Sequence, residues 1–150
     1  MNVICINNRN NYPPLVLPIC LESNIGDNCF VSNKEWYTVD KDLLGYSIGI
    51  GCRYEVYGIL FFSNQIRYLI QDDKGMPGFF PESLFQIETR EVFFDWKTAH
   101  YSVCTGELFF VGYPDLSDEY EKLRDLIDQK NNAVANFLKY KQYVSEVGSQ

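Results

Sequence analysis

The stretch from residue 53 to residue 88 constrains the fold more than any other part of this 150-residue chain. Short runs of aromatic and β-branched residues alternate there with turn residues, a pattern typical of antiparallel strands. The pattern predicts strands at 54–62, 66–70, 78–80 and 84–88, turns at 63–65 and 72–75, and a single-turn break at 81–83. Short strands joined by tight turns favour a small barrel or a strongly bent antiparallel sheet.

The residues around this stretch add further elements. Residues 3–6 form a short apolar run that predicts a buried strand. Residues 12–50 have weak periodicity and many proline and glycine breakers, which indicates a long insertion in which 29–31 and 36–39 are strands or packed loop. Two aromatic segments, 91–96 and 107–111, predict strands or packed extended segments.

The C-terminal tail carries a helical pattern. Ser117 is a suitable N-cap, and the acidic first turn and the lysines of the last turn match the helix dipole. Apolar residues recur at helical spacing at Leu116, Tyr120, Leu123, Ile127, Val134, Phe137 and Leu138. The dipeptide Asn131-Asn132 is a point at which this pattern would divide into two helices. We therefore predict an α+β, mainly-β fold in a single domain, in which 1–90 forms the barrel with its insertion and 91–150 adds strands and a packed helix.

The order of the elements predicted in 1–88 resembles that of small SH3-like barrel proteins of bacteria and phages. Four segments carry the resemblance: NVICIN (2–7), GCRYEVY (51–57), YLIQDDKG (68–75) and GFFPESLF (78–85). It implies that the break before the last strand is the single helical turn of that fold, and the insertion at 12–50 departs from the pattern. Acidic proteins of this size also resemble, more weakly, the immunity proteins that neutralise secreted toxins. A likeness of fold does not by itself assign a function.

The charge of the chain constrains its partners. Twenty acidic residues against 13 lysines and arginines give a formal net charge of −7, spread over the whole length without a basic stripe. Such a surface repels nucleic acid and attracts basic proteins. No leader pattern and no apolar window of about 18 residues occurs, so we expect no membrane contact. Five cysteines at irregular spacing indicate reduced, mostly buried thiols and a cytoplasmic location.

Few residues suggest catalysis. His100 is the only histidine and Cys104 follows it by four residues, so a small Cys/His hydrolase is one alternative, although a strand or loop between them would not align the two side chains. The chain lacks the spaced ligands of a zinc or calcium site, and Asp72-Asp73 is typical of a solvated turn. We expect no enzyme activity, no metal and no cofactor.

The remaining candidates point to protein binding. Adjacent phenylalanines in a strand point to opposite faces, so one member of each of three pairs is a candidate for exposure: Phe61-Phe62, Phe79-Phe80 and Phe93-Phe94. Aromatic residues of a barrel groove and acidic residues of the turns and the helix start are the expected contact set: Tyr57, Phe79, Trp96, Asp72, Asp73, Glu82, Asp115, Asp118, Glu119 and Glu121. Core packing, helix capping and solubility are the alternative roles of these residues. The expected function is that of an immunity-type inhibitor of a basic toxin such as a nuclease, and the alternative is a peptide-binding adaptor.

Overall fold

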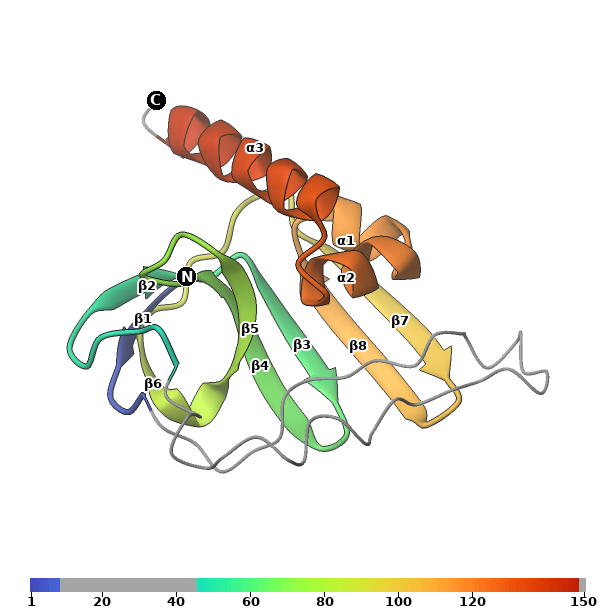
Figure 1. Ribbon diagram of the computed structural model, residues 1–150, viewed down its shortest axis with the longest axis horizontal. Helices are drawn as coiled ribbons and strands as arrows, with labels where there is room; N and C mark the ends of the chain where they lie inside the picture. The colour runs from blue at the N-terminus through green and yellow to red at the C-terminus, as the bar shows by residue number, and fades with distance from the viewer. Residues whose placement is uncertain (9–45, 149–150) are drawn as a thin grey trace.

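The computed structural model describes residues 1–8 and 46–148, which form two antiparallel sheets and a helical tail (Figure 1). The strands expected at 29–31 and 36–39, and most of the expected insertion, lie outside the described residues. In chain order the elements are β1 (Asn2–Cys5), β2 (Arg53–Glu55), β3 (Gly58–Phe62), β4 (Gln65–Gln71), β5 (Pro77–Pro81), the 3₁₀ turn η3 (Glu82–Leu84), β6 (Phe85–Thr89), β7 (Lys97–Val103), β8 (Gly106–Gly112), α1 (Pro114–Asp118), α2 (Tyr120–Ile127) and α3 (Asn131–Gly148).

The strands belong to a three-stranded sheet of order β2-β1-β6 and a five-stranded sheet of order β5-β4-β3-β8-β7. The α+β, mainly-β fold class is therefore confirmed. Both sheets are open, so the expectation of a closed barrel is wrong and that of antiparallel sheets is right. The reason lies in β3, whose second edge pairs with β8, because this pairing extends the sheet outward instead of closing it.

The predicted hairpin and turns are confirmed in β3, β4 and β5. Ser63 and Asn64 both have positive φ, of 54° and 59°, which gives the tight turn between Phe62 and its cross-strand partner Gln65. Gly75, with φ of 82°, completes the turn before β5. The predicted break before the last strand is η3.

The single long strand expected at 54–62 is divided into β2 and β3. The backbone N–H of Val56 donates to Met1 on the three-stranded sheet, whereas that of Tyr57 donates to Leu69 on the five-stranded sheet. The chain passes from one sheet to the other between these two residues. Side-chain periodicity does not record such a change of pairing partner.

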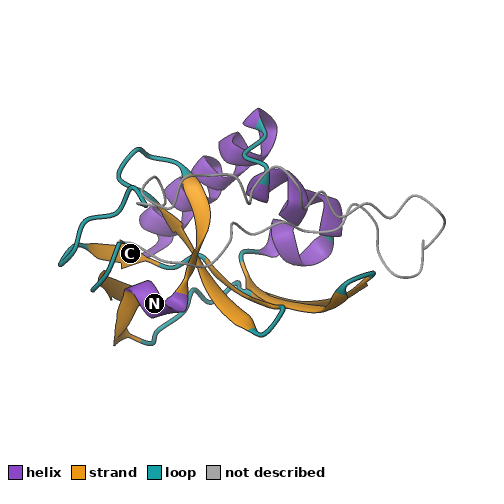
Figure 2. Cartoon of the chain, turned by 60° about the horizontal axis from the view of Figure 1, so that its bottom comes forward, coloured by secondary structure: helices purple, strands orange, loops and turns teal. Residues whose placement is uncertain are grey.

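Two hydrophobic cores lie on opposite faces of the five-stranded sheet. The helix-side core lies between this sheet and the helices and includes Leu60, Phe62, Leu69, Leu108, Phe110, Leu116, Leu123, Leu126 and Phe137. The inter-sheet core lies between the two sheets and includes Val3, Cys5, Tyr54, Val56, Tyr68, Ile70, Phe80, Leu84 and Phe85. Figure 2 shows the helices gathered on one side of the strands.

The tail forms three helices instead of the one or two expected. Ser117 lies inside α1, where its hydroxyl donates to the carbonyl of Lys97 at 2.8 Å, so its expected role as an N-cap is wrong. The chain breaks again before Asn131, where Gln129 has a φ of 54°. Most of the predicted apolar stripe is buried or half-buried, but Leu138 is exposed.

The segment 91–96 is not a strand, although 107–111 lies within β8 as expected. It forms a turn, in which the N–H of Trp96 donates to the carbonyl of Phe93 at 3.3 Å. Its Asp95 accepts a hydrogen bond of 2.8 Å from the hydroxyl of Tyr140 on α3. Phe93 packs against Tyr140 of the helical tail, Trp96 packs against the inter-sheet core and Phe94 is exposed, so the segment does not extend a sheet.

Candidate functional site

A strip of aromatic rings crosses the five-stranded sheet on the face opposite to the helices. We call this surface the open face and define it by Phe61 on β3, Phe109 and Glu107 on β8, and His100 and Ser102 on β7. Phe61, Phe109 and His100 are direct cross-strand neighbours. The rings of Phe61 and Phe109 have centroids 6.4 Å apart, and the imidazole of His100 stacks on Phe109 at 4.5 Å with an interplanar angle of 6°.

The open face arises from the alternation of side chains along each strand. Phe62 and Phe110 point into the helix-side core and are 8% and 2% exposed. Their neighbours Phe61 and Phe109 point to the other side and are 40% and 47% exposed. Two large apolar side chains thus lie next to each other, uncovered by the described parts of the chain.

Polar groups lie beside the aromatic strip. The ring Nε2 of His100 contacts Oε2 of Glu107, and the hydroxyl of Ser102 donates to the same oxygen at 2.9 Å. The hydrogen bond with His100, followed by that from Ser102, holds the pKa of the Glu107 carboxyl below its ordinary value. The open face therefore carries a carboxylate that stays ionised, and none of its defining residues is a lysine or an arginine.

The possible hydrolase pair is not assembled. The described contact of the His100 imidazole with an acid is to Glu107, and Ser102 directs its hydroxyl to the same carboxylate instead of to the imidazole. Cys104, in the turn after β7, is disulfide-bonded, so its sulfur is not available as a nucleophile. The expectation of reduced, buried thiols is therefore wrong for Cys104. It is right for Cys5, which is free and buried, and only half right for Cys52, which is free but exposed.

The expected contact residues Asp72 and Asp73 organise their own part of the fold. Oδ1 of Asp72 accepts the backbone N–H groups of Lys74 and Met76, both at 2.9 Å, and so fixes the turn before β5. Oδ1 of Asp73 accepts the hydroxyl of Tyr54 at 2.6 Å. These intramolecular hydrogen bonds give both carboxylates a structural role that does not require a partner protein.

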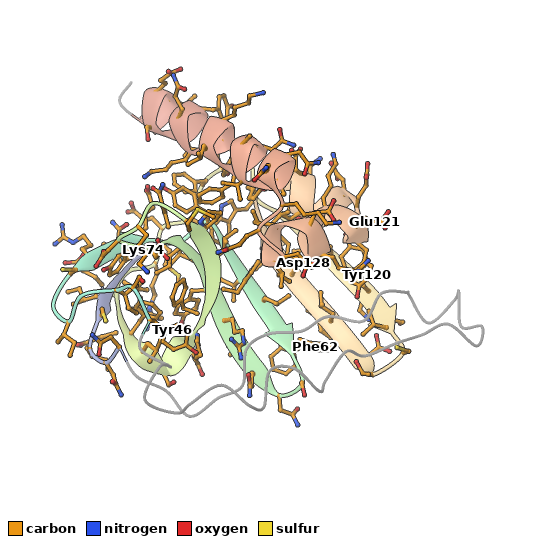
Figure 3. The ribbon with its side chains drawn as sticks, in the orientation of Figure 1. Tyr46, Phe62, Lys74, Tyr120, Glu121 and Asp128 are labelled. Carbon is orange, nitrogen blue, oxygen red and sulfur yellow. The ribbon has the colours of Figure 1, made fainter. Side chains whose placement is uncertain are left out.

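The expected acidic residues of the helix start lie on α1, on α2 and at Glu119 between them, on the far side of the sheet from the open face. Asp118, Glu119 and Glu121 are exposed, and each lies 3.7–3.9 Å from a lysine or arginine of the same chain. Pairs of this kind between exposed side chains are worth about 1 kcal/mol or less. Figure 3 shows Tyr120 and Glu121 at the start of α2 and Asp128 directly after its end; Tyr120 is buried. Asp115 is half-buried near the start of α1, and Glu82 is exposed on η3.

The expected aromatic groove is not present as an exposed feature. Tyr57 is 2% exposed; its ring stacks on Phe93, and its hydroxyl donates to Glu55 at 2.9 Å. Phe79 and Trp96 are half-buried, against the helix-side and inter-sheet cores respectively. Core packing, the alternative role considered for these aromatic residues, accounts for Tyr57 completely and for Phe79 and Trp96 in large part.

The sequence reasoning did not name the open face. It identified part of the signal, because it expected one member of the pair Phe61-Phe62 to be exposed, and Phe61 is that member, whereas the pair Phe109-Phe110 was not considered. The adjacency of the two exposed rings depends on the register of β3 with β8, which residue types alone do not specify.

Comparison with known proteins does not identify the chain. No protein-family profile, no curated protein and no solved structure matches it. Within residues 1–8 and 46–148, no three acidic, histidine or cysteine side chains come together as metal ligands. None of the helices in those residues has the length and apolar character needed to span a lipid bilayer.

Proposed function

We propose that this protein binds another protein through the open face. The observation that carries the proposal is the pair of half-exposed rings, Phe61 and Phe109, on adjacent strands of a rigid sheet. Aromatic side chains supply much contact area at a small cost in side-chain entropy, and a few such anchors commonly dominate the affinity of an interface. Because a packed sheet positions them, little further ordering is required on binding.

The proposed partner is a basic protein. The chain has a net charge of −7, and the open face places the carboxylate of Glu107 two residues from the ring of Phe109. A guanidinium or ammonium group of the partner would stack on an aromatic ring and pair with this carboxylate. The exposed acids of α1 and α2 would add long-range attraction that accelerates encounter without touching the partner.

An immunity-type inhibitor is the biological role that we propose for such binding. A toxin that acts on nucleic acid needs a basic substrate surface, and an acidic protein that docks there would exclude the substrate. The order of the elements supports the finer proposal of an SH3-like ancestry. β1, β2 and β6 form one sheet, β3, β4 and β5 lie side by side in the other, and η3 precedes β6. On this proposal, β7 and β8 are an addition to the edge of that fold.

A second candidate function, a peptide-binding adaptor, is supported by β7. This seven-residue strand lies at the edge of its sheet and contains no proline, so an extended peptide could pair with its outer edge. Val103 and Gly106 flank the two-residue turn and form a hydrogen-bonded pair, and such pairs alternate along the hairpin with pairs that are not hydrogen-bonded. Thr98, five residues before Val103, belongs to a pair of the second kind, so its N–H points away from β8. Strand addition would therefore be blocked by Thr98→Pro and would persist without the two exposed phenylalanines.

The test begins with affinity capture from the native host, using the wild type, the double variant Phe61→Ala/Phe109→Ala, and Phe94→Ala as the matched control. Phe94 is 75% exposed in the turn between β6 and β7, away from the open face. We expect the wild type and the control to retain the same basic protein and the double variant to lose it. With the purified partner, Kd should rise at least about tenfold in the double variant and should also rise with salt.

Equal affinity of the double variant and the wild type, with the fold intact by circular dichroism, would contradict the proposed use of the open face. The cytoplasm is the compartment proposed for this inhibitor. Disulfides are rare there and Cys104 is disulfide-bonded, so fractionation of native cells tests this part of the proposal separately.

A further inference from the structure

Two free cysteines face each other where the chain enters β2. The backbone N–H of Cys5 donates to the carbonyl of Cys52 at 2.9 Å, and the N–H of Gly51 donates to the carbonyl of Cys5 at 2.7 Å. Gly51 has a φ of 83°. This arrangement is a β-bulge in which Gly51 and Cys52 together oppose Cys5. The bulge therefore fixes the two cysteines as direct cross-strand neighbours.

The register places both side chains on the same face of the three-stranded sheet. Val3 pairs with Tyr54, and both are buried in the inter-sheet core. Cys5 and Cys52 each lie two residues from these partners, so they share that face. Opposed residues that exchange a ladder hydrogen bond have Cα atoms about 5.5 Å apart, which lies within the range that a disulfide spans.

The two thiols differ in access. Cys5 is 1% exposed and its Sγ donates to the carbonyl of Asn7 at 3.2 Å, whereas Cys52 is exposed. Burial raises the pKa of the Cys5 thiol, which lowers the amount of its reactive thiolate. An external reagent therefore reaches Cys52 first, and Cys5 is positioned to react afterwards with the modified neighbour.

We propose that Cys5 and Cys52 form a redox-active pair that a low-molecular-weight disulfide, such as glutathione disulfide, converts into an intramolecular disulfide. The thiolate of Cys52 attacks one sulfur of glutathione disulfide, which breaks that S–S bond, forms a mixed disulfide and releases one glutathione. Cys5 then loses its proton and turns away from Asn7. Its thiolate attacks Sγ of Cys52 and releases the second glutathione. The two protons of the cysteines pass to the two glutathione molecules, so the exchange needs no other oxidant.

This inference is independent of the proposed function, because the cysteine pair and the open face lie on different sheets. It assigns a modification site to the start of β2. A closed disulfide would join the two ends of the chain segment between residue 5 and residue 52.

The experiment treats the purified full-length protein, as isolated, with glutathione disulfide and maps its peptides by mass spectrometry without reduction. We expect one linked peptide pair containing Cys5 and Cys52, lighter than the two separate peptides by two hydrogens, and an increase in melting temperature. In Cys5→Ser, we expect the mass of one glutathione to remain on Cys52. In Cys52→Ser, we expect Cys5 to stay unmodified.

Three results would overturn the proposal. The first is a stable mixed disulfide on wild-type Cys52, because it would mean that Cys5 does not resolve it. The second is a Cys52 that stays unreacted under conditions in which glutathione disulfide modifies the thiol of a control peptide. The third is a link from Cys52 to a cysteine other than Cys5. Because all three are read on the wild type, they remain decisive if a serine variant fails to fold.

Discussion

Replacing Gly112 by alanine should destabilise the fold strongly, because two strands approach each other closely at this residue. Gly112 on β8 pairs with Gly58 on β3, and the ring of Phe110 lies over both. A Cβ at Gly112 would collide first with the ring of Phe110, and it would also lie 2.7 Å from Cα of Gly58 and 2.8 Å from the carbonyl oxygen of Tyr57. Non-bonded carbon atoms prefer about 3.5–4.0 Å, so β3 and β8 would have to separate by roughly 1 Å at the end of the pair where β3 begins and β8 ends.

The expected cost follows from the kind of atom that the methyl group meets. Overpacking typically costs about 1–3 kcal/mol, and we expect about 3 kcal/mol for Gly112→Ala because backbone atoms cannot rotate away. With a urea dependence of about 2 kcal/mol per molar, the unfolding midpoint should fall by about 1.5 M. At Gly58 an added Cβ meets mainly the ring of Phe110, at 2.6 Å, so Gly58→Ala should cost less.

The assay is urea unfolding followed by far-UV circular dichroism, with Gly148→Ala as the control because no atom lies within 4 Å of a Cβ at that position. The control should stay within about 0.5 kcal/mol of the wild type. Phe110→Leu should relieve most of the cost of Gly58→Ala but only part of that of Gly112→Ala, where the contacts with backbone atoms remain, and a double-mutant cycle resolves this difference. A Gly112→Ala protein as stable as the control would refute the reasoning.

Three further predictions concern single sites. Asp72→Ala leaves two turn amides without their acceptor and should lower the free energy of unfolding by about 1–3 kcal/mol in the same urea assay; a loss below about 0.5 kcal/mol would contradict this role. The pKa of Glu107 is lowered in the folded state, so its contribution to stability is present above its ordinary pKa and disappears as the pH falls through the lowered value. An NMR titration should show that this pKa rises toward its ordinary value in His100→Ala, and an unchanged pKa would show that His100 is not the cause. A disulfide between Cys5 and Cys52 should raise the free energy of unfolding by up to about 4 kcal/mol, measured by comparing oxidised and reduced protein in urea, and equal stability of the two forms would count against a closed loop.

Local chemistry explains the part of the fold that the sequence predicted. The turn at Ser63 and Asn64 requires positive φ, and Gly75 supplies it in the next turn, so both turns were visible from residue types alone. η3 was visible for a similar reason, because a proline followed by polar residues interrupts two apolar runs. These features depend on residues close together in the chain.

The errors arose where distant contacts decide the structure. The segment 91–96 has the composition of a strand, but Asp95 and its neighbours pack on α3 about 45 positions later in the chain. Ser117 has the composition of an N-cap, but its hydroxyl bonds to the carbonyl of Lys97. Tertiary partners of this kind override local preference and leave no pattern in the sequence.

In the candidate site, too, local features were predictable from the sequence and long-range contacts were not. The exposure of one member of Phe61-Phe62 was foreseen from strand alternation, whereas Phe109 was not considered, and the adjacency of Phe61 and Phe109 depends on the register of β3 with β8. Tyr57 was expected at a binding groove, but the chain changes sheets beside it and turns its ring into the helix-side core. Composition alone does not distinguish an aromatic anchor from an aromatic core residue.

The position of β4 has a consequence for how the molecule unfolds. Leu69 of this strand packs in the helix-side core, whereas Tyr68 and Ile70 on either side pack in the inter-sheet core. Loss of β4 would remove one wall from each core at once, so an unfolding event that breaks this strand opens both cores. A substitution that breaks β4 should therefore weaken both cores, whichever face of the sheet the altered side chain occupies.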